Sequence, residues 1–200
     1  MINAWRINGN SRYILNICGM VLCLAGCAQD NGADTQNEPD TQNEQMAQPK
    51  MTLWQAIDAL PRQIPFTKIR IERLLSAELV ETDEGGNDLL RFFKSNRVKL
   101  LDGVVIENVD LRIKRVGPDP GFLVLDTGGS CVTIEDVRLH YKNLRITDRP
   151  RGRSLEEVTS HTTTLSWGTL SFGFKERNRK CLASVAFDPT SAKTGDGSGE

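Results

Sequence analysis

Residues 104–125 read VVIENVDLRIKRVGPDPGFLVL, and this stretch decides the fold class. Apolar and polar residues alternate through Val104–Val116, a period of two that is typical of a half-buried β-strand. The segment Gly117–Gly121 then favours a tight turn, because proline fixes φ at a value found in turns and glycine accepts the positive φ that turns often need. The apolar run Phe122–Leu125 predicts a second strand after the turn. The sequence therefore predicts consecutive antiparallel strands here.

The same period of two appears on both sides of this stretch. It predicts a hairpin of residues 78–83 and 89–94 around the turn 84–87, a strand at 98–101, a long strand at 163–174 and a partner strand at 182–187.

Helical spacing marks four other segments. Thr52 can cap a helix over 52–60, which ends before Pro61. Residues 67–76 fit either a strand or a helix, and we favour the helix. Capping-box patterns predict a helix at 134–142 and a short helical turn at 154–157. Together these elements predict an α+β domain, mainly an antiparallel sheet with two to four short helices and one disulfide.

The charge balance narrows the classes of partner. The chain has 200 residues, with 25 Lys and Arg against 26 Asp and Glu, a net charge of −1. This balance indicates neither nucleic-acid binding nor a basic membrane-binding surface. We expect a single domain at 51–189, followed by a small, polar, disordered tail at 190–200.

The N-terminus carries the clearest targeting signal. Arg6 and Arg12 precede an apolar run at 13–24, which is shorter than the roughly 20 residues of a membrane-spanning helix. The segment Leu24–Cys27, LAGC, resembles the lipobox of bacterial lipoproteins. That resemblance implies a signal peptide at 1–26, cleavage before Cys27, and acylation of Cys27. Several acyl chains anchor a protein stably, whereas one holds it weakly.

The residues after Cys27 predict location and reach. Ala28 stands where, by the same resemblance, an Asp would retain a lipoprotein in the inner membrane. We therefore expect an outer-membrane anchor with the domain facing the periplasm. Residues 27–50 comprise the lipidated Cys and a polar segment with five acidic residues, one Lys and no aromatic residue. Such a composition cannot bury a core, and it predicts a flexible tether.

Two cysteines remain within the domain, Cys131 and Cys181, and in an oxidising compartment they predict a disulfide. A metal site or a catalytic thiol is the alternative. The chain has no Cys-x-x-Cys pattern, and His140 and His161 lack metal-ligand spacing. We expect neither a metal nor a cofactor.

The stretch Gly121–Val132, GFLVLDTGGSCV, resembles the active-site strand and turn of aspartic proteases, and the similarity covers roughly residues 121–139. Those enzymes pair two carboxylates that share one proton. The chain has one Asp-Thr-Gly, so Asp126 would need a homodimer. The family's later apolar-apolar-Gly segment has no match, because Ser171 interrupts the nearest candidate. We favour Asp126 as a turn residue.

Two other catalytic arrangements are weaker. Ser130, His140 and Asp126 could form a triad, but Ser130 lacks the Gly-x-Ser-x-Gly context of a nucleophile elbow. Glu107 and Asp110 lie on a predicted strand and point to opposite faces, unless residue 107 is bulged. We assign no catalytic residue.

Cationic residues cluster in two predicted loops, and these are the predicted partner-binding residues: Arg145, Arg149, Arg151, Arg153, Lys175, Arg177, Arg179 and Lys180. Arginine suits this role because its guanidinium pairs bidentately with carboxylates. Location and architecture resemble those of periplasmic immunity lipoproteins. We therefore expect an inhibitor of an antibacterial effector that targets the envelope. The alternative is an envelope assembly or accessory lipoprotein, and a homodimeric aspartic protease is less favoured.

Overall fold

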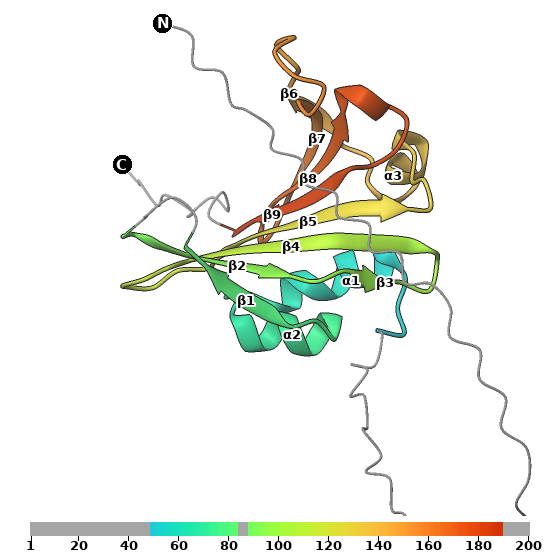
Figure 1. Ribbon diagram of the computed structural model, residues 1–200. Coiled ribbons are helices and arrows are strands. Elements are labelled where there is room, and N and C mark those ends of the chain that lie inside the picture. Colours follow the sequence, from blue (N-terminus) through green and yellow to red (C-terminus); the bar gives the residue numbers. More distant parts are fainter. Residues whose placement is uncertain (1–48, 84–87, 190–200) are drawn as a thin grey trace, which may run out of the picture. The chain divides into compact units, whose positions relative to one another are not determined.

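Nine strands, all paired antiparallel, form one sheet in the computed structural model, which describes residues 49–83 and 88–189 (Figure 1). Their order across the sheet is β1-β2-β4-β5-β9-β8-β7-β6, and β3 pairs with β4. The predicted signal peptide, nearly all of the tether, the turn 84–87 and the tail lie outside the described residues. Within those described ranges, no helix is long and apolar enough to cross a membrane.

The strands confirm the antiparallel part of the sequence prediction. The hairpin predicted at 104–125 is present, because β4 pairs with β5 from Val104 opposite Gly129 to Arg112 opposite Phe122. The strands are β1 (Leu79–Thr82), β2 (Leu90–Ser95), β3 (Val98–Lys99), β4 (Val104–Lys114), β5 (Phe122–Gly129), β6 (Arg145–Asp148), β7 (Val158–Leu165), β8 (Gly168–Lys175) and β9 (Ser184–Asp188).

In the part of the chain that the structure describes, three α-helices and two 3₁₀ turns accompany the sheet, and each α-helix begins at a threonine cap. The side chains of Thr52, Thr67 and Thr133 accept hydrogen bonds from backbone N–H groups three residues ahead. The predictions of helices near 52–60, 67–76 and 134–142 are confirmed. The elements are α1 (Leu53–Ala59), η1 (Leu60–Gln63), α2 (Lys68–Leu75), α3 (Ile134–His140) and η3 (Glu176–Asn178).

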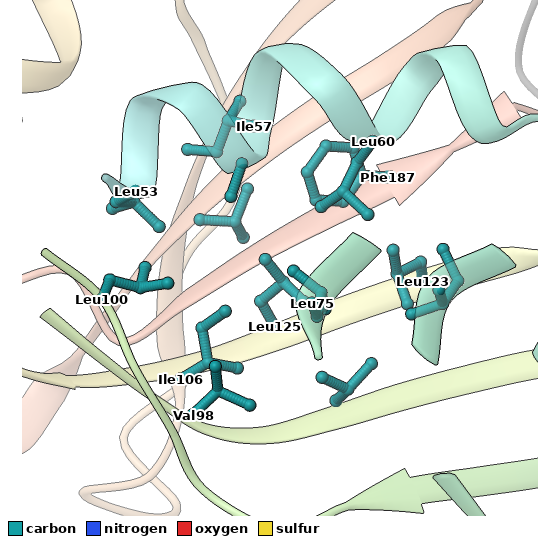
Figure 2. Close-up of a cluster of buried hydrophobic side chains, with 14 of the residues drawn as sticks. Leu53, Ile57, Leu60, Leu75, Val98, Leu100, Ile106, Leu123, Leu125 and Phe187 are labelled. Atoms are coloured by element: carbon teal, nitrogen blue, oxygen red, sulfur yellow. The ribbon is translucent and has the colours of Figure 1, made fainter. Parts of the chain in front are cut away.

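The core lies between one face of the sheet and the helices. Alternate residues of neighbouring strands meet on that face, as Leu123 does with Phe187. Figure 2 shows Leu60 of the α1–η1 segment beside Phe187, and Leu53 of the same segment on the side of Leu100. The largest side chains with under 2% exposure are four phenylalanines: Phe66, Phe93, Phe172 and Phe187. Burial of this apolar surface is the main source of stability.

The long strand predicted at 163–174 is wrong, because the chain reverses inside it. Ser166 and Trp167 form a two-residue turn between β7 and β8. Gly168 follows with φ of +147°, and a Cβ there would lie 2.3 Å from the carbonyl oxygen of Asp188. Only glycine fits that close approach of two backbones. The apolar and β-branched residues around the turn hide it from a periodicity argument.

Two further differences concern the segment 145–157. The helical turn predicted at 154–157 is wrong, because Ser154 caps a plain turn by accepting from the N–H of Glu156 at 3.0 Å. The sequence also gave no reason to expect β6, whose four residues are all exposed. A strand that buries no side chain has no hydrophobic alternation to reveal it.

The stability of the start of α3 depends on pH through the carboxylate of Asp136. The Thr133 N–H and hydroxyl each donate to Asp136 Oδ2 at 2.8 Å, and with the charge of His140 they hold the pKa of Asp136 below its ordinary value of 3.8. Because the folded-state pKa is the lower one, this stabilisation is present above the unfolded pKa and disappears as pH falls through the folded one.

We therefore expect Asp136→Asn to unfold at lower urea concentration than wild type near pH 7, with a difference that shrinks as the pH approaches about 2. Urea unfolding followed by tryptophan fluorescence across that range measures this. A difference that stays constant with pH would contradict the assignment.

Candidate functional site

The predicted disulfide is confirmed and fixes one end of the sheet. Cys131 and Cys181 are bonded, with 5.0 Å between their Cα atoms, and the closed loop spans 50 residues. Beside it, the N–H of Leu182 donates to the carbonyl of Val132 at 2.8 Å. The segment between β5 and α3 is therefore joined to the segment that leads into β9.

The structure brings the two cationic loops side by side. We call residues 149–157 the β6–β7 loop and residues 176–183 the β8–β9 loop. The N–H of Arg177 donates to the carbonyl of Leu155 at 2.9 Å, and the N–H of Glu176 donates to the carbonyl of Glu157 at 2.8 Å. The β8–β9 loop also contains Cys181. One loop is thus tied to the disulfide, and the other is tied to that loop.

Glu157 shapes the β6–β7 loop from inside. Its Oε2 accepts hydrogen bonds from three consecutive backbone N–H groups, those of Arg151 at 2.6 Å, Gly152 at 3.0 Å and Arg153 at 3.4 Å. Gly152 adopts a positive φ of +78°, which glycine tolerates without strain. The backbone of the loop is therefore held at Arg151 and Arg153, the two arginines that flank Gly152.

Glu156 neutralises part of the cationic charge. Its carboxylate bridges Lys175 Nζ and Arg177 Nη1, each at 2.8 Å. The hydrogen bond from Lys175 is the largest influence that lowers the pKa of Glu156, and the charge of Arg177 adds to it. Arg179 pairs in the same way with Glu176. These three cations serve the internal structure of the loops.

The remaining predicted partner-binding cations are free within the described ranges 49–83 and 88–189. Their side chains form neither an ion pair nor a hydrogen bond there, and all of them are exposed to solvent. Exposed and unpaired guanidinium groups are available to a partner's carboxylates. This set, which we call the free cations, comprises Arg145, Arg149, Arg151, Arg153 and Lys180.

His161 shows that the positive field extends towards α3. This residue lies on β7 opposite Ile146 of β6, with its ring 5.6 Å from that of Phe174. Burial lowers the pKa of His161, and the charges of Arg138 and Arg149 lower it further. Arg138, an exposed residue of α3 that is ion-paired with Glu135 at 3.6 Å, therefore adds to the positive charge around His161, and the sequence had not drawn attention to it.

Asp126 is a strand residue, so its interpretation as a turn residue is wrong. It lies inside β5 opposite Asn108 and Ser184, and Asn108 Nδ2 donates to its Oδ2 at 3.1 Å. The Asp-Thr-Gly-Gly segment continues the strand to Gly129, because β4 pairs with all of it and β9 pairs with it as far as Asp126. Pairing with strands that are distant in the sequence therefore outweighs the turn preference of these residues.

A groove of about 460 Å³ contains Asp126 and a second carboxylate, that of Glu107. The β4–β5 register shifts between Ile106 and Asn108, so residue 107 is bulged, the exception left open by the strand argument. Glu107 is ion-paired with Arg97, and that hydrogen bond lowers its pKa. Both oxygens of Glu107 accept hydrogen bonds from the Arg97 guanidinium, so this carboxylate is not arranged to share a proton with Asp126.

The other residues considered for catalysis make separate contacts. The ring of His140 stacks on Trp54 at 3.9 Å, whereas Asp126 is held by Asn108. Ser130 stands at the end of β5 and lines the same groove as Asp126. Asp110 pairs with Arg112 at 2.6 Å and not with Glu107. In the described part of the chain, no group of His, Cys, Asp and Glu has the arrangement of a metal site.

The strongest feature for function is therefore a cationic surface at the end of the sheet that holds the disulfide. It consists of the free cations, on a backbone ordered by Glu156, Glu157 and Cys181. The chain matches no protein-family model, no curated protein and no solved structure.

Proposed function

We propose that the protein is a lipid-anchored, periplasm-facing binding protein that inhibits an antibacterial effector by covering an acidic cleft of that effector. The observation that carries the proposal is the direct pairing of the two cationic loops through Arg177 and Leu155, at 2.9 Å. That pairing places the loop that carries Lys180 beside the loop that carries Arg149, Arg151 and Arg153. Several arginines on one surface suit an acidic protein partner.

The backbone of both loops is already held in one conformation, and this favours binding. A loop that must be ordered on binding costs conformational entropy, and this cost subtracts from affinity. Here Glu157 already holds three backbone N–H groups, and the disulfide fixes the neighbouring loop. The surface is therefore formed before any partner arrives, as in many inhibitors that bind enzyme clefts.

The predicted lipid anchor at the N-terminus supports a partner that acts in the periplasm. Leu24–Cys27 resembles a lipobox, and the polar residues up to 50 would let a domain reach beyond the lipid headgroups. An effector that acts on the envelope would then meet this domain before its substrate. The observed surface also suits the alternative, an accessory lipoprotein that binds an acidic envelope complex, and the partner's identity separates the two.

The test uses a soluble fragment of residues 28–200 and the secreted products of the neighbouring genes as candidate effectors. We expect one effector to bind it stoichiometrically and to lose its hydrolytic activity on binding. Reversing the charge of two free cations, Arg149→Glu with Arg151→Glu, should weaken binding at least about tenfold, because the acidic groups of the partner would then face negative charges.

A matched control makes the same change in net charge elsewhere. Arg62 of η1 and Arg73 of α2 are exposed, so Arg62→Glu with Arg73→Glu should alter affinity by less than about threefold. Equal losses in both double variants would show that net charge alone matters, and unchanged binding in the first would remove the cationic surface from the interface. Capture of an envelope complex with no hydrolase inhibited would favour the accessory lipoprotein.

A further inference from the structure

The strand β6 is the last strand at one side of the sheet, and its outer edge carries no strand within the described residues. Its four residues, Arg145–Asp148, are all exposed. In Figure 1, β6 and the β6–β7 loop form the outermost part of the sheet at the top of the view. An edge strand presents unpaired backbone N–H and C=O groups, which can pair with a strand from another chain.

The edge is held in place without being buried. Arg145 pairs with Thr162 and Ile146 pairs with His161 in the β6–β7 register. A row of hydroxyls also crosses three strands, since Thr147 Oγ1 lies 2.7 Å from Thr162 Oγ1, which lies 2.7 Å from Ser171 Oγ. Side-chain hydrogen bonds of this kind stabilise cross-strand pairs. The strand is thus ready to receive a partner although it buries none of its own side chains.

The positive charge on this edge favours an added strand that carries acidic residues. Arg145 lies on β6 itself, and Arg149, Arg151 and Arg153 follow directly in the β6–β7 loop, all of them free cations. The acid on the strand, Asp148, accepts the backbone N–H of Arg149 at 2.9 Å. An antiparallel second copy of β6 would set Arg145 opposite Asp148, but it would offer no carboxylate to the arginines of the β6–β7 loop. An acidic segment would meet complementary charges.

An exposed apolar side chain adds to the same edge. Ile146 is 42% exposed and lies beside His161 on the face opposite to the hydroxyl row. A segment that alternates acidic and apolar residues would match both faces of β6, because successive side chains of a strand point to opposite faces.

Resting on the function proposed above, we propose that an extended acidic segment of the partner pairs with the outer edge of β6 as a further strand. Main-chain hydrogen bonds to β6 then supply the register. The carboxylates of the added strand lie against Arg145 and the arginines of the β6–β7 loop, and an apolar residue of the strand covers Ile146.

A protective role is the contrasting explanation of the same edge. Charged residues and bulges on edge strands are also used to prevent aggregation, and the β6–β7 register shifts between Ile146 and Asp148. A protective edge would reject every added strand, whereas a receptive one accepts acidic strands alone. The two explanations therefore give opposite results with a defined peptide.

The probe is a capped peptide of about six residues, the usual length of a strand, with the alternating sequence Glu-Val-Glu-Val-Glu-Val. One control peptide replaces each Glu with Lys, and a second replaces each Val with Pro, which keeps the charge but removes backbone donors. We expect the Glu-Val peptide to bind the 28–200 fragment and to slow hydrogen exchange of amides in residues 145–148. The Lys-Val peptide should not bind, and the Glu-Pro peptide should give no protection.

Arg145→Glu should weaken binding of the Glu-Val peptide at least about tenfold, and Arg62→Glu should leave it within about twofold of wild type. Failure of the Glu-Val peptide to bind, or binding without slower exchange in β6, would overturn strand addition. If the effector binds without protecting β6, strand addition is wrong while the inhibitor function stands. If the peptide pairs with β6 but no effector is inhibited, the edge is receptive and the proposed function is wrong.

Discussion

Phe187→Ala is expected to lower the free energy of unfolding by about 3–5 kcal/mol, the range measured for removal of a buried phenylalanine ring. Phe187 is fully buried on β9, a strand with partners on both sides. Its ring centroid lies 6.4 Å from that of Phe66 and 6.0 Å from that of Trp167. Truncation would leave a cavity between the α1–η1 segment and the sheet, where Figure 2 places this ring.

Urea unfolding at constant pH measures the change, with Phe187→Leu and Ile69→Ala as controls. Leu retains most of the apolar volume and should cost clearly less than Ala. Ile69 is 64% exposed on α2, so its truncation should change stability by no more than about 0.5 kcal/mol. A loss of less than about 1 kcal/mol for Phe187→Ala would contradict the central position given to this residue.

Removal of the disulfide is expected to cost about 4 kcal/mol, because a loop of 50 residues is then no longer closed in the unfolded chain. The variant is Cys131→Ser combined with Cys181→Ser, which avoids leaving one reactive thiol. Urea unfolding measures the loss. Reduction of the wild-type protein should reproduce it, and the double variant should not respond to reductant.

The disulfide also has a local consequence for the cationic surface. Without it, the β8–β9 loop keeps the backbone hydrogen bond from Leu182 to Val132, at 2.8 Å, and its pairing to the β6–β7 loop. We expect faster hydrogen exchange at the amides of Glu176 and Arg177, because the fluctuations of a freed loop open those bonds more often. Unchanged exchange there, in a folded double variant, would show that the disulfide stabilises the fold without ordering the site.

Much of the fold could be predicted from local signals. The alternation in 104–114, the turn at 117–121 and the threonine caps of α1 and α3 all act within a few residues of one another. Each signal depends on the geometry of one strand, one turn or one helix start, so the sequence suffices to find it. The cysteine pair was equally accessible, because only two cysteines lie within the domain.

The errors share a physical cause. Asp126 was interpreted as a turn residue and 163–174 as one strand, and in both cases contacts with distant strands decided the outcome. Asp126 stays extended because β4 and β9 pair with it. The chain turns at Ser166 and Trp167 because β8 folds back to pair with β7 and with β9, and a Cβ on Gly168 would lie 2.3 Å from the carbonyl oxygen of Asp188. No property of the neighbouring sequence encodes those distances.

The sequence by itself placed eight cationic residues in two segments, and it determined the antiparallel α+β class. Only the tertiary structure decided which of those cations can meet a partner. The register of β7 against β8 brings Glu156 to Lys175 and Arg177, and so removes them from the free set. The pairing of β6 with β7 leaves Arg145 on the outermost strand, and Arg149 and Arg151 are exposed in the loop that follows it. An ion pair depends on distance in space, and the pairing of strands sets that distance.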